Sequence, residues 1–184
     1  MNLNFLFRLL LTINATSLLL IVFLVQKSYT LDCFFPGVPW LETASPFVSY
    51  LFYIAVPVAL TWLSIRISSW LGKDEFSAGD VVEISYANNS FLPSYLGYFF
   101  VALSVPNWDT LIVVYGMLFV FTFRSQALYF NPLFLLYGFE FYNVTTQGGA
   151  SLFLISKKRY KLPVNVVIHT ARRINDFTFM EREG

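Results

Sequence analysis

The sequence predicts an α-helical polytopic membrane protein with four transmembrane helices, both termini in the cytosol, and a small cytosolic β-rich module. Three observations support this fold class. Hydrophobic residues make up 57% of the 184 residues and charged residues only 12%, which is too few charges to coat a water-facing surface of this size. Apolar runs dominate the chain up to residue 124. Beyond that point, short runs that alternate in polarity are typical of strands.

The first two apolar runs are each long enough to cross the roughly 30 Å hydrocarbon core of a bilayer. They cover Phe5–Val25 and Pro46–Leu71, and Pro57 is expected to kink the second. Within the first run, Arg8 precedes the apolar stretch Leu9–Val25, as the basic region of a signal peptide would. It is longer than the apolar region of a signal peptide and no small-residue cleavage site follows it, so we interpret it as a retained span.

The last two apolar runs are shorter and cover Phe91–Val105 and Thr110–Arg124. A tight turn at Pro106–Asp109 is expected between them. We interpret them as two true spans, which an extension of the second run to Phe130 would lengthen. A re-entrant hairpin that enters the membrane and returns is the alternative. These four spans make residues 1–130 the transmembrane domain.

The basic residues predict the orientation, because Lys and Arg concentrate on the cytoplasmic flanks of membrane spans. With both termini inside, 11 of the 12 basic residues fall on the cytosolic side, and only Lys27 falls outside. Trp40, Trp70 and Trp108 stand at predicted span ends, where amphipathic rings are favoured.

Residues 131–184 are interpreted as the β-rich module. Two short runs, 137–144 and 151–156, flank the turn signal Thr145–Gly149 and predict a hairpin. Val164–His169 and Ile174–Met180 are expected to form two further strands. Within the cytosolic loop 72–90, Asp80–Tyr86 could add a strand to the same sheet. A hairpin alone is marginally stable, so such additional strands are needed.

No catalytic site or cofactor site is expected. The chain lacks a phosphate-binding loop, a glycine fingerprint for dinucleotides and a serine nucleophile elbow. Cys33 is its one cysteine and His169 its one histidine, which cannot build a structural zinc site. We therefore expect no enzyme activity and no metal.

Polar and small residues inside the spans are interpreted first as packing residues. Asn14 is expected to act as interhelical glue, with pore lining as the alternative, and Ala55 and Ala59 form a small-xxx-small packing pair. Thr61, Ser64 and Ser68 share one face of the second span.

A group of basic residues in the predicted module is the strongest candidate for a partner-binding surface. The group consists of Lys157, Lys158, Arg159, Lys161, Arg172 and Arg173. These charges could hold the segment near anionic headgroups or dock an acidic face of a cytosolic protein. Direct nucleic-acid contact is not expected, because six charges with little aromatic interleaving make a weak nucleic-acid surface.

The layout of four apolar spans, the Asp80–Tyr86 stretch and the C-terminal texture GFEFYNVTTQGGASLFLISKKRY…ARRINDFTFME together resemble KwaA, the membrane component of the bacterial Kiwa anti-phage defence system. The resemblance implies a sensor at the bacterial inner membrane that responds to phage arrival. It also implies association with the cytosolic partner KwaB, which acts on phage DNA, and a homo-oligomeric membrane subunit. It offers no catalytic residues.

The leading hypothesis is therefore a non-enzymatic membrane sensor or anchor that recruits or regulates a cytosolic DNA-acting effector. The alternative is an oligomeric pore or channel that permeabilises the membrane, for which the polar face of the second span would supply a lining.

Overall fold

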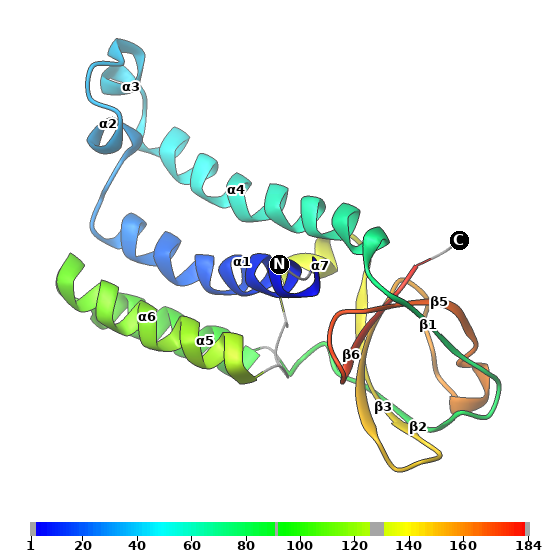
Figure 1. Cartoon of the computed structure of the whole chain (residues 1–184). Coiled ribbons are helices and arrows are strands. Elements are labelled where there is room, and N and C mark those ends of the chain that lie inside the picture. The colour runs from blue at the N-terminus through cyan, green and yellow to red at the C-terminus, as the bar shows by residue number, and fades with distance from the viewer. Residues whose placement is uncertain (1–2, 91, 126–130, 183–184) are drawn as a thin grey trace.

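The computed structural model describes residues 3–90, 92–125 and 131–182. The chain forms a layer of long helices with a curved β-sheet at one end of it (Figure 1). The long helices are α1 (Leu3–Gln26), α4 (Pro46–Ile67), α5 (Leu92–Ser104) and α6 (Trp108–Ser125). The short helices are α2 (Leu31–Phe34), α3 (Pro39–Thr43), η1 (Ser68–Trp70), α7 (Leu133–Leu136) and η2 (Pro163–Asn165).

Among the described residues, three helices are long and apolar enough to cross a membrane, and they cover Leu3–Gln26, Pro46–Trp70 and Trp108–Ser125. The third of the four expected spans corresponds to α5, which has 13 residues. At 1.5 Å per residue its length is about 20 Å, less than the thickness of the hydrocarbon core. The expected extension of the last span to Phe130, and the expected domain boundary after it, lie outside the described residues.

Helix α1 is the central helix of the layer, because it packs against α4, α5 and α6. Its fully buried apolar side chains repeat every four residues at Phe7, Leu11, Ala15, Leu19 and Phe23. This spacing places them on one stripe of the helix. The outer faces of α4, α5 and α6 instead expose large apolar side chains, as a lipid-facing surface does.

The turn before α6 lies earlier than the sequence indicated. Trp108 and Asp109 were expected in the turn, but both belong to the first turn of α6. Asn107 caps the helix, since its Oδ1 accepts a hydrogen bond from the backbone N–H of Thr110 at 2.9 Å. Asp109 is also favourable there, because negative charge stabilises a helix N-terminus.

The sheet has six strands in the order β1-β5-β6-β4-β3-β2. The strands are β1 (Lys73–Phe76), β2 (Val81–Tyr86), β3 (Glu140–Thr146), β4 (Ser151–Ser156), β5 (Ile168–Arg173) and β6 (Thr178–Glu181). Strands β4 and β6 pair in parallel, and the other neighbours pair antiparallel. The predicted β3–β4 hairpin and the additional strand within Asp80–Tyr86 are confirmed.

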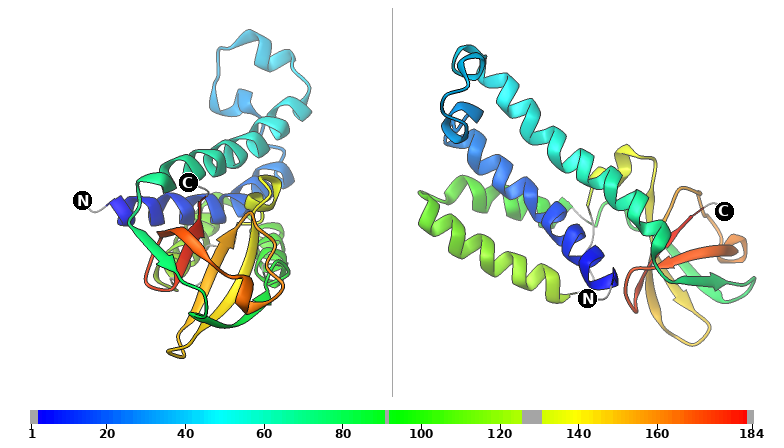
Figure 2. Two further views of the ribbon diagram at one scale, coloured as in Figure 1. Left: turned by 90° about the vertical axis from the view of Figure 1, so that its right-hand side faces the viewer. Right: turned by 45° about the horizontal axis from the view of Figure 1, so that its top comes forward.

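The sheet must curl, because its two edge strands are consecutive in the chain. Only residues 77–80 join β1 to β2. Such a loop reaches at most about 17 Å, whereas six strands laid flat would separate their edges by about 24 Å. The sheet is therefore curved, as both views in Figure 2 show. Its strands enclose an inner apolar core. Phe76 of β1 packs edge-on against Phe179 of β6 inside this core, with ring centroids 5.2 Å apart.

Two strand predictions in the C-terminal segment had wrong boundaries. Val164 and Asn165 belong to the short helix η2, and β5 starts only at Ile168. Pro163 begins η2, where a fixed φ and a missing N–H are tolerated. Residues 174–177 form a turn rather than a strand, since Asn175 Oδ1 accepts a hydrogen bond from the Phe177 N–H at 2.8 Å.

The helices and the sheet share one hydrophobic core, here called the junction core. It consists of buried side chains from α1, from α7, from the chain just after α4, and from five segments in or beside the sheet. These residues are Phe7, Leu11, Leu71, Ala87, Phe134, Phe139, Phe141, Phe153, Ile155, Ile174 and Met180. Phe134 of α7 is fully buried and meets Phe139 and Phe141 edge-on, with ring centroids 5.9 Å and 6.4 Å apart. The sheet is therefore packed onto the helices rather than tethered by a linker.

Candidate functional site

The basic candidate residues of the C-terminal segment lie in two places. Lys157, Lys158, Arg159 and Lys161 occupy the loop of residues 157–161 that leaves β4, here called the basic loop. Arg172 and Arg173 lie at the end of β5. Each group has its own contacts, so each is described separately.

Lys158 of the basic loop is bound to a buried carboxylate at the end of β6. Glu181 is 5% exposed, and its Oε1 accepts a hydrogen bond from Lys158 Nζ at 2.7 Å. Its Oε2 accepts hydrogen bonds from the Tyr160 hydroxyl at 2.8 Å and from the Ser156 hydroxyl. Burial, with the neighbouring carboxylate, raises the pKa of Tyr160, so this hydroxyl stays protonated and donates. Glu181 therefore fixes the loop to the sheet.

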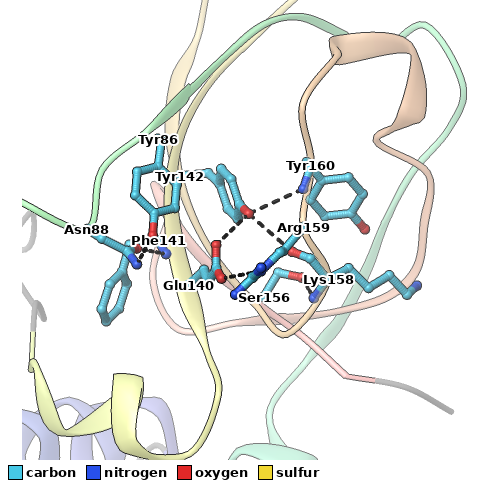
Figure 3. Close-up of polar contacts among 9 residues, drawn as sticks. All are labelled: Tyr86, Asn88, Glu140, Phe141, Tyr142, Ser156, Lys158, Arg159 and Tyr160. Atoms are coloured by element: carbon cyan, nitrogen blue, oxygen red, sulfur yellow. Dashed lines mark hydrogen bonds and ion pairs between the residues drawn. The ribbon is translucent and has the colours of Figure 1, made fainter.

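A second carboxylate holds the other side of the loop, as Figure 3 shows. Glu140 of β3 accepts hydrogen bonds from Arg159 Nε at 2.8 Å and from the Tyr142 hydroxyl at 3.1 Å. The Tyr142 hydroxyl in turn accepts from the backbone N–H of Tyr160 at 3.2 Å. Burial raises the pKa of Tyr142, which keeps it a neutral donor. The basic loop is thus preorganised by contacts to two acidic side chains.

The remaining basic candidates differ in whether their side chains form hydrogen bonds or ion pairs within the chain. The Arg172 guanidinium donates to the carbonyl of Leu71 at 2.8 Å, so this residue joins β5 to the chain that follows α4. Arg173 pairs with Asp176 at 2.6 Å on an exposed surface. Lys157 lies over the ring of Phe139 at 5.1 Å, and Lys161 is exposed. Arg159 and Lys161 are therefore the members best placed to meet another molecule.

An open hollow of about 520 Å³ adjoins Arg159 and Lys161. Ile84 and Tyr86 of β2 supply its apolar side, and Tyr86 is 60% exposed. Close by in the chain, Leu162 is also largely exposed. Arginine and tyrosine side chains beside exposed apolar residues are typical of protein–protein interfaces.

A buried polar cluster joins three segments inside the helical layer. The Asn14 amide of α1 lies 2.7 Å from the Thr61 hydroxyl of α4. In the amide orientation that satisfies both of its polar atoms, Asn14 donates to the Pro57 carbonyl at 3.1 Å and accepts from Asn131 Nδ2 at 2.8 Å. Tyr137 adds a further link, since its hydroxyl donates to the carbonyl of Val58 at 2.9 Å. The segment around α7 is thereby hydrogen-bonded to the middle of α4.

The other helix-packing candidates lie on opposite faces of α4. Thr61, Ser64 and Ser68 are fully buried, and each hydroxyl donates to a backbone carbonyl three or four residues earlier. Ala55 and Ala59 are exposed, so they face away from the helices that the structure describes. That outer face is available to lipid or to another chain.

Glu181, Glu140 and Asn131 were not singled out from the sequence. A lone glutamate in the run Phe177–Glu181 carries no spacing signal that would mark it as buried. A buried carboxylate requires hydrogen-bond donors, and here Lys158 and Tyr160 supply them. That these donors lie 21 or more positions away in the chain is a property of the sheet order.

Comparison with protein families adds an independent finding. The model of the family described as anti-phage protein KwaA matches residues 7–180, nearly the whole chain. Comparisons with curated proteins and with solved structures gave no match. The matched range includes most of α1, all of the other three long helices and nearly all of the sheet, and membership implies a role in anti-phage defence. The chain therefore belongs to the KwaA family of anti-phage proteins.

Proposed function

We propose that this protein is a non-enzymatic sensor or anchor subunit of an anti-phage defence complex in the bacterial inner membrane. In this proposal it spans the membrane several times with both termini in the cytoplasm, and it recruits or regulates a cytosolic DNA-acting effector similar to KwaB. The family supports the defence role, and the apolar helices support the membrane location.

The observation that carries the sensor role is the junction core. Side chains of α1 and α7 pack directly against side chains of β3 and β4 in this core. A close-packed core transmits displacement, because its side chains cannot shift independently without opening voids. A disturbance that moved α1 relative to α4 would therefore repack the sheet, and the basic loop leaves the sheet directly at the end of β4.

Docking of the effector is assigned to the basic loop and the hollow beside it. Arg159 has a side chain that is 82% exposed even though it pairs with Glu140. Lys161 and Tyr86 flank the same hollow. An acidic face on the effector would add charge complementarity, which accelerates association and selects the partner.

The test is affinity purification of the tagged protein from membranes with the neighbouring effector co-expressed. The variants Arg159→Glu and Lys161→Glu are expected to reduce effector recovery at least tenfold while the protein stays folded. Lys27→Glu makes the same charge change at the opposite end of the helices and should leave recovery unchanged. Equal recovery from all variants would contradict docking at the basic loop, and no recovery with the wild type would contradict recruitment.

An oligomeric pore is the alternative function, but its expected lining is occupied. Thr61 and Ser64 are fully buried and hydrogen-bonded within the chain, so they line no conduit among the described residues. Dye or ion leakage from vesicles that contain the purified protein would separate the two functions.

A further inference from the structure

A second hollow, of about 370 Å³, lies where the end of α4 meets the sheet. Trp62 and Arg66 of α4 form one wall, and Lys157 and Lys158 of the basic loop form another. Arg182, which follows β6, closes the end. Its volume falls within the range of roughly 300–1,000 Å³ that small-molecule sites occupy.

The hollow carries an excess of positive charge. Arg66, Lys157, Lys158 and Arg182 line it, and Glu181 is the one carboxylate among its lining residues that the structure describes. Four cations against one anion leave three positive charges. Glu181 is already bound by Lys158 and by two hydroxyls. Within the described part of the chain, Arg66, Lys157 and Arg182 form no ion pair.

Aromatic rings and α4 hold these three cations in place without neutralising them. The Arg66 guanidinium lies 5.0 Å from the centroid of the Trp62 ring, and Lys157 lies 5.1 Å from that of Phe139. Arg182 donates to the carbonyl of Ile65 and to the hydroxyl of Ser68 at 3.3 Å. A cation over a ring keeps most of its N–H groups available, so they can bind an anion.

The depth of the hollow along α4 corresponds to the headgroup level of a bilayer. Arg66 lies in the last turn of α4, which starts at Pro46. At 1.5 Å per residue the distance between the two is about 30 Å, the thickness of the hydrocarbon core. Trp62, one turn earlier, is 49% exposed and suits the interfacial belt.

We propose that this hollow binds the phosphate group of an anionic phospholipid headgroup, with Arg66, Lys157 and Arg182 as its donors. The proposal rests on the membrane placement in the proposed function. Guanidinium groups bind phosphate oxygens through paired hydrogen bonds, and basic pockets beside membrane helices bind anionic headgroups. Ile65 and Trp62 offer an apolar wall beside the cations, which suits the glycerol and first methylenes of a lipid.

Such a lipid would connect the bilayer to the sheet, because its phosphate would be held by α4 on one side and by the basic loop on the other. The hollow shares Lys158 and Glu181 with the network that positions the basic loop. Loss of the lipid would therefore change the position of the basic loop, which is the surface assigned to the effector.

The test uses the full chain in detergent, with native mass spectrometry of bound phosphatidylglycerol in competition with phosphatidylcholine. The wild type is expected to retain phosphatidylglycerol preferentially. The double variant Arg66→Gln/Lys157→Gln should lower this preference on the order of tenfold, because it removes two of the positive charges that attract the anionic headgroup. Arg124→Gln removes an exposed arginine from the last turn of α6, outside the hollow, and should leave the preference unchanged.

Arg182 is left intact in the double variant, because its contacts to α4 could serve folding. Unchanged melting temperature and secondary structure confirm that the double variant is folded, and Lys157→Gln alone provides a milder variant. Equal retention of both lipids by the wild type would overturn the proposal, as would an unchanged preference in the folded variants.

Two further arms distinguish the source of the phosphate and the class of ligand. Soluble inorganic phosphate should not displace the lipid at millimolar concentration, and displacement would reassign the hollow to a free anion. Loss of effector recovery with unchanged lipid retention would reassign it to a protein contact. Because lipid retention is measured without effector, its failure leaves recruitment intact, and flotation of the protein with vesicles tests membrane placement separately.

Discussion

Phe134→Ala tests whether the helices and the sheet form one cooperative unit. Phe134 is fully buried in the junction core, with aromatic neighbours on β3 and on the loop before it. Truncation of a buried phenylalanine costs about 3–5 kcal/mol, which includes the cavity that remains. The lost stability should affect both the helices and the sheet, since α7 is hydrogen-bonded to α4 through Tyr137.

The assay is amide hydrogen exchange on protein in lipid nanodiscs. The variant should exchange roughly a hundredfold faster or more in β3, in β4 and in the first two turns of α1, because local opening there becomes easier by the lost free energy. Exchange in α6 should change little, since α6 contributes no side chain to the junction core among the described residues.

Leu136→Ala provides the matched control. Leu136 lies on the same short helix but is 70% exposed, so its truncation removes little buried surface. If Phe134→Ala accelerated exchange in the sheet and left α1 protected, helices and sheet would be separate units. The transmission of displacement through the junction core would then be refuted.

Three further outcomes follow from the structure. Asn14→Ala removes an amide that bonds to α4 and should lower stability by about 1–2 kcal/mol, measured by thermal melting in detergent beside Ser17→Ala, which loses only a bond within α1. Glu181→Gln removes the partner of Lys158 and should cost about 2–3 kcal/mol, less than a fully buried pair because that lysine is half exposed; an unchanged melting temperature would argue against the network. Ala55→Phe places a bulky ring on the exposed face of α4 and should leave the monomer folded but shift light-scattering mass downward if that face joins copies of the chain.

Much of the helical layer could be predicted from hydropathy alone. Runs of about 20 apolar residues admit few alternatives, so α1 and α4 start and end within a few residues of the expected bounds. The error at Trp108 and Asp109 has a local cause. The sequence Pro-Asn-Trp-Asp is typical of a turn, but Asn107 caps a helix that already includes Trp108 and Asp109.

The sheet was harder to predict because its pairing is not local. Strand β1 has the sequence Lys-Asp-Glu-Phe, which shows no apolar alternation, and it forms because β5 pairs with it at the edge. The loop after α1 contains two short helices, α2 and α3, for which the sequence analysis made no prediction. Contacts with segments far away in the chain determine whether such short elements form, and a single sequence does not show which segments make those contacts.

The sequence identified the basic residues, but it did not show which of them stabilise the fold and which remain available to a partner. Clustering in the sequence suggested one surface, whereas Arg172 turns toward Leu71 and Lys158 toward Glu181. Charge counts alone cannot separate cations that stabilise the fold from cations that remain available. That separation needs the positions of Glu140 and Glu181, which the curled sheet brings to the basic loop.

The strand order has a consequence for biosynthesis. Strands β1 and β2 are translated before α5 and α6, yet β1 pairs with β5 and β2 pairs with β3, which both follow α6. Strand β6, the last of the six to leave the ribosome, enters the interior of the sheet between β5 and β4. Strands β1 and β2 must therefore remain unpaired while α5 and α6 are synthesised, and the sheet closes only after its final strand emerges. A nascent chain arrested before residue 178 would expose open edges, which makes it a natural substrate for proteolytic surveillance.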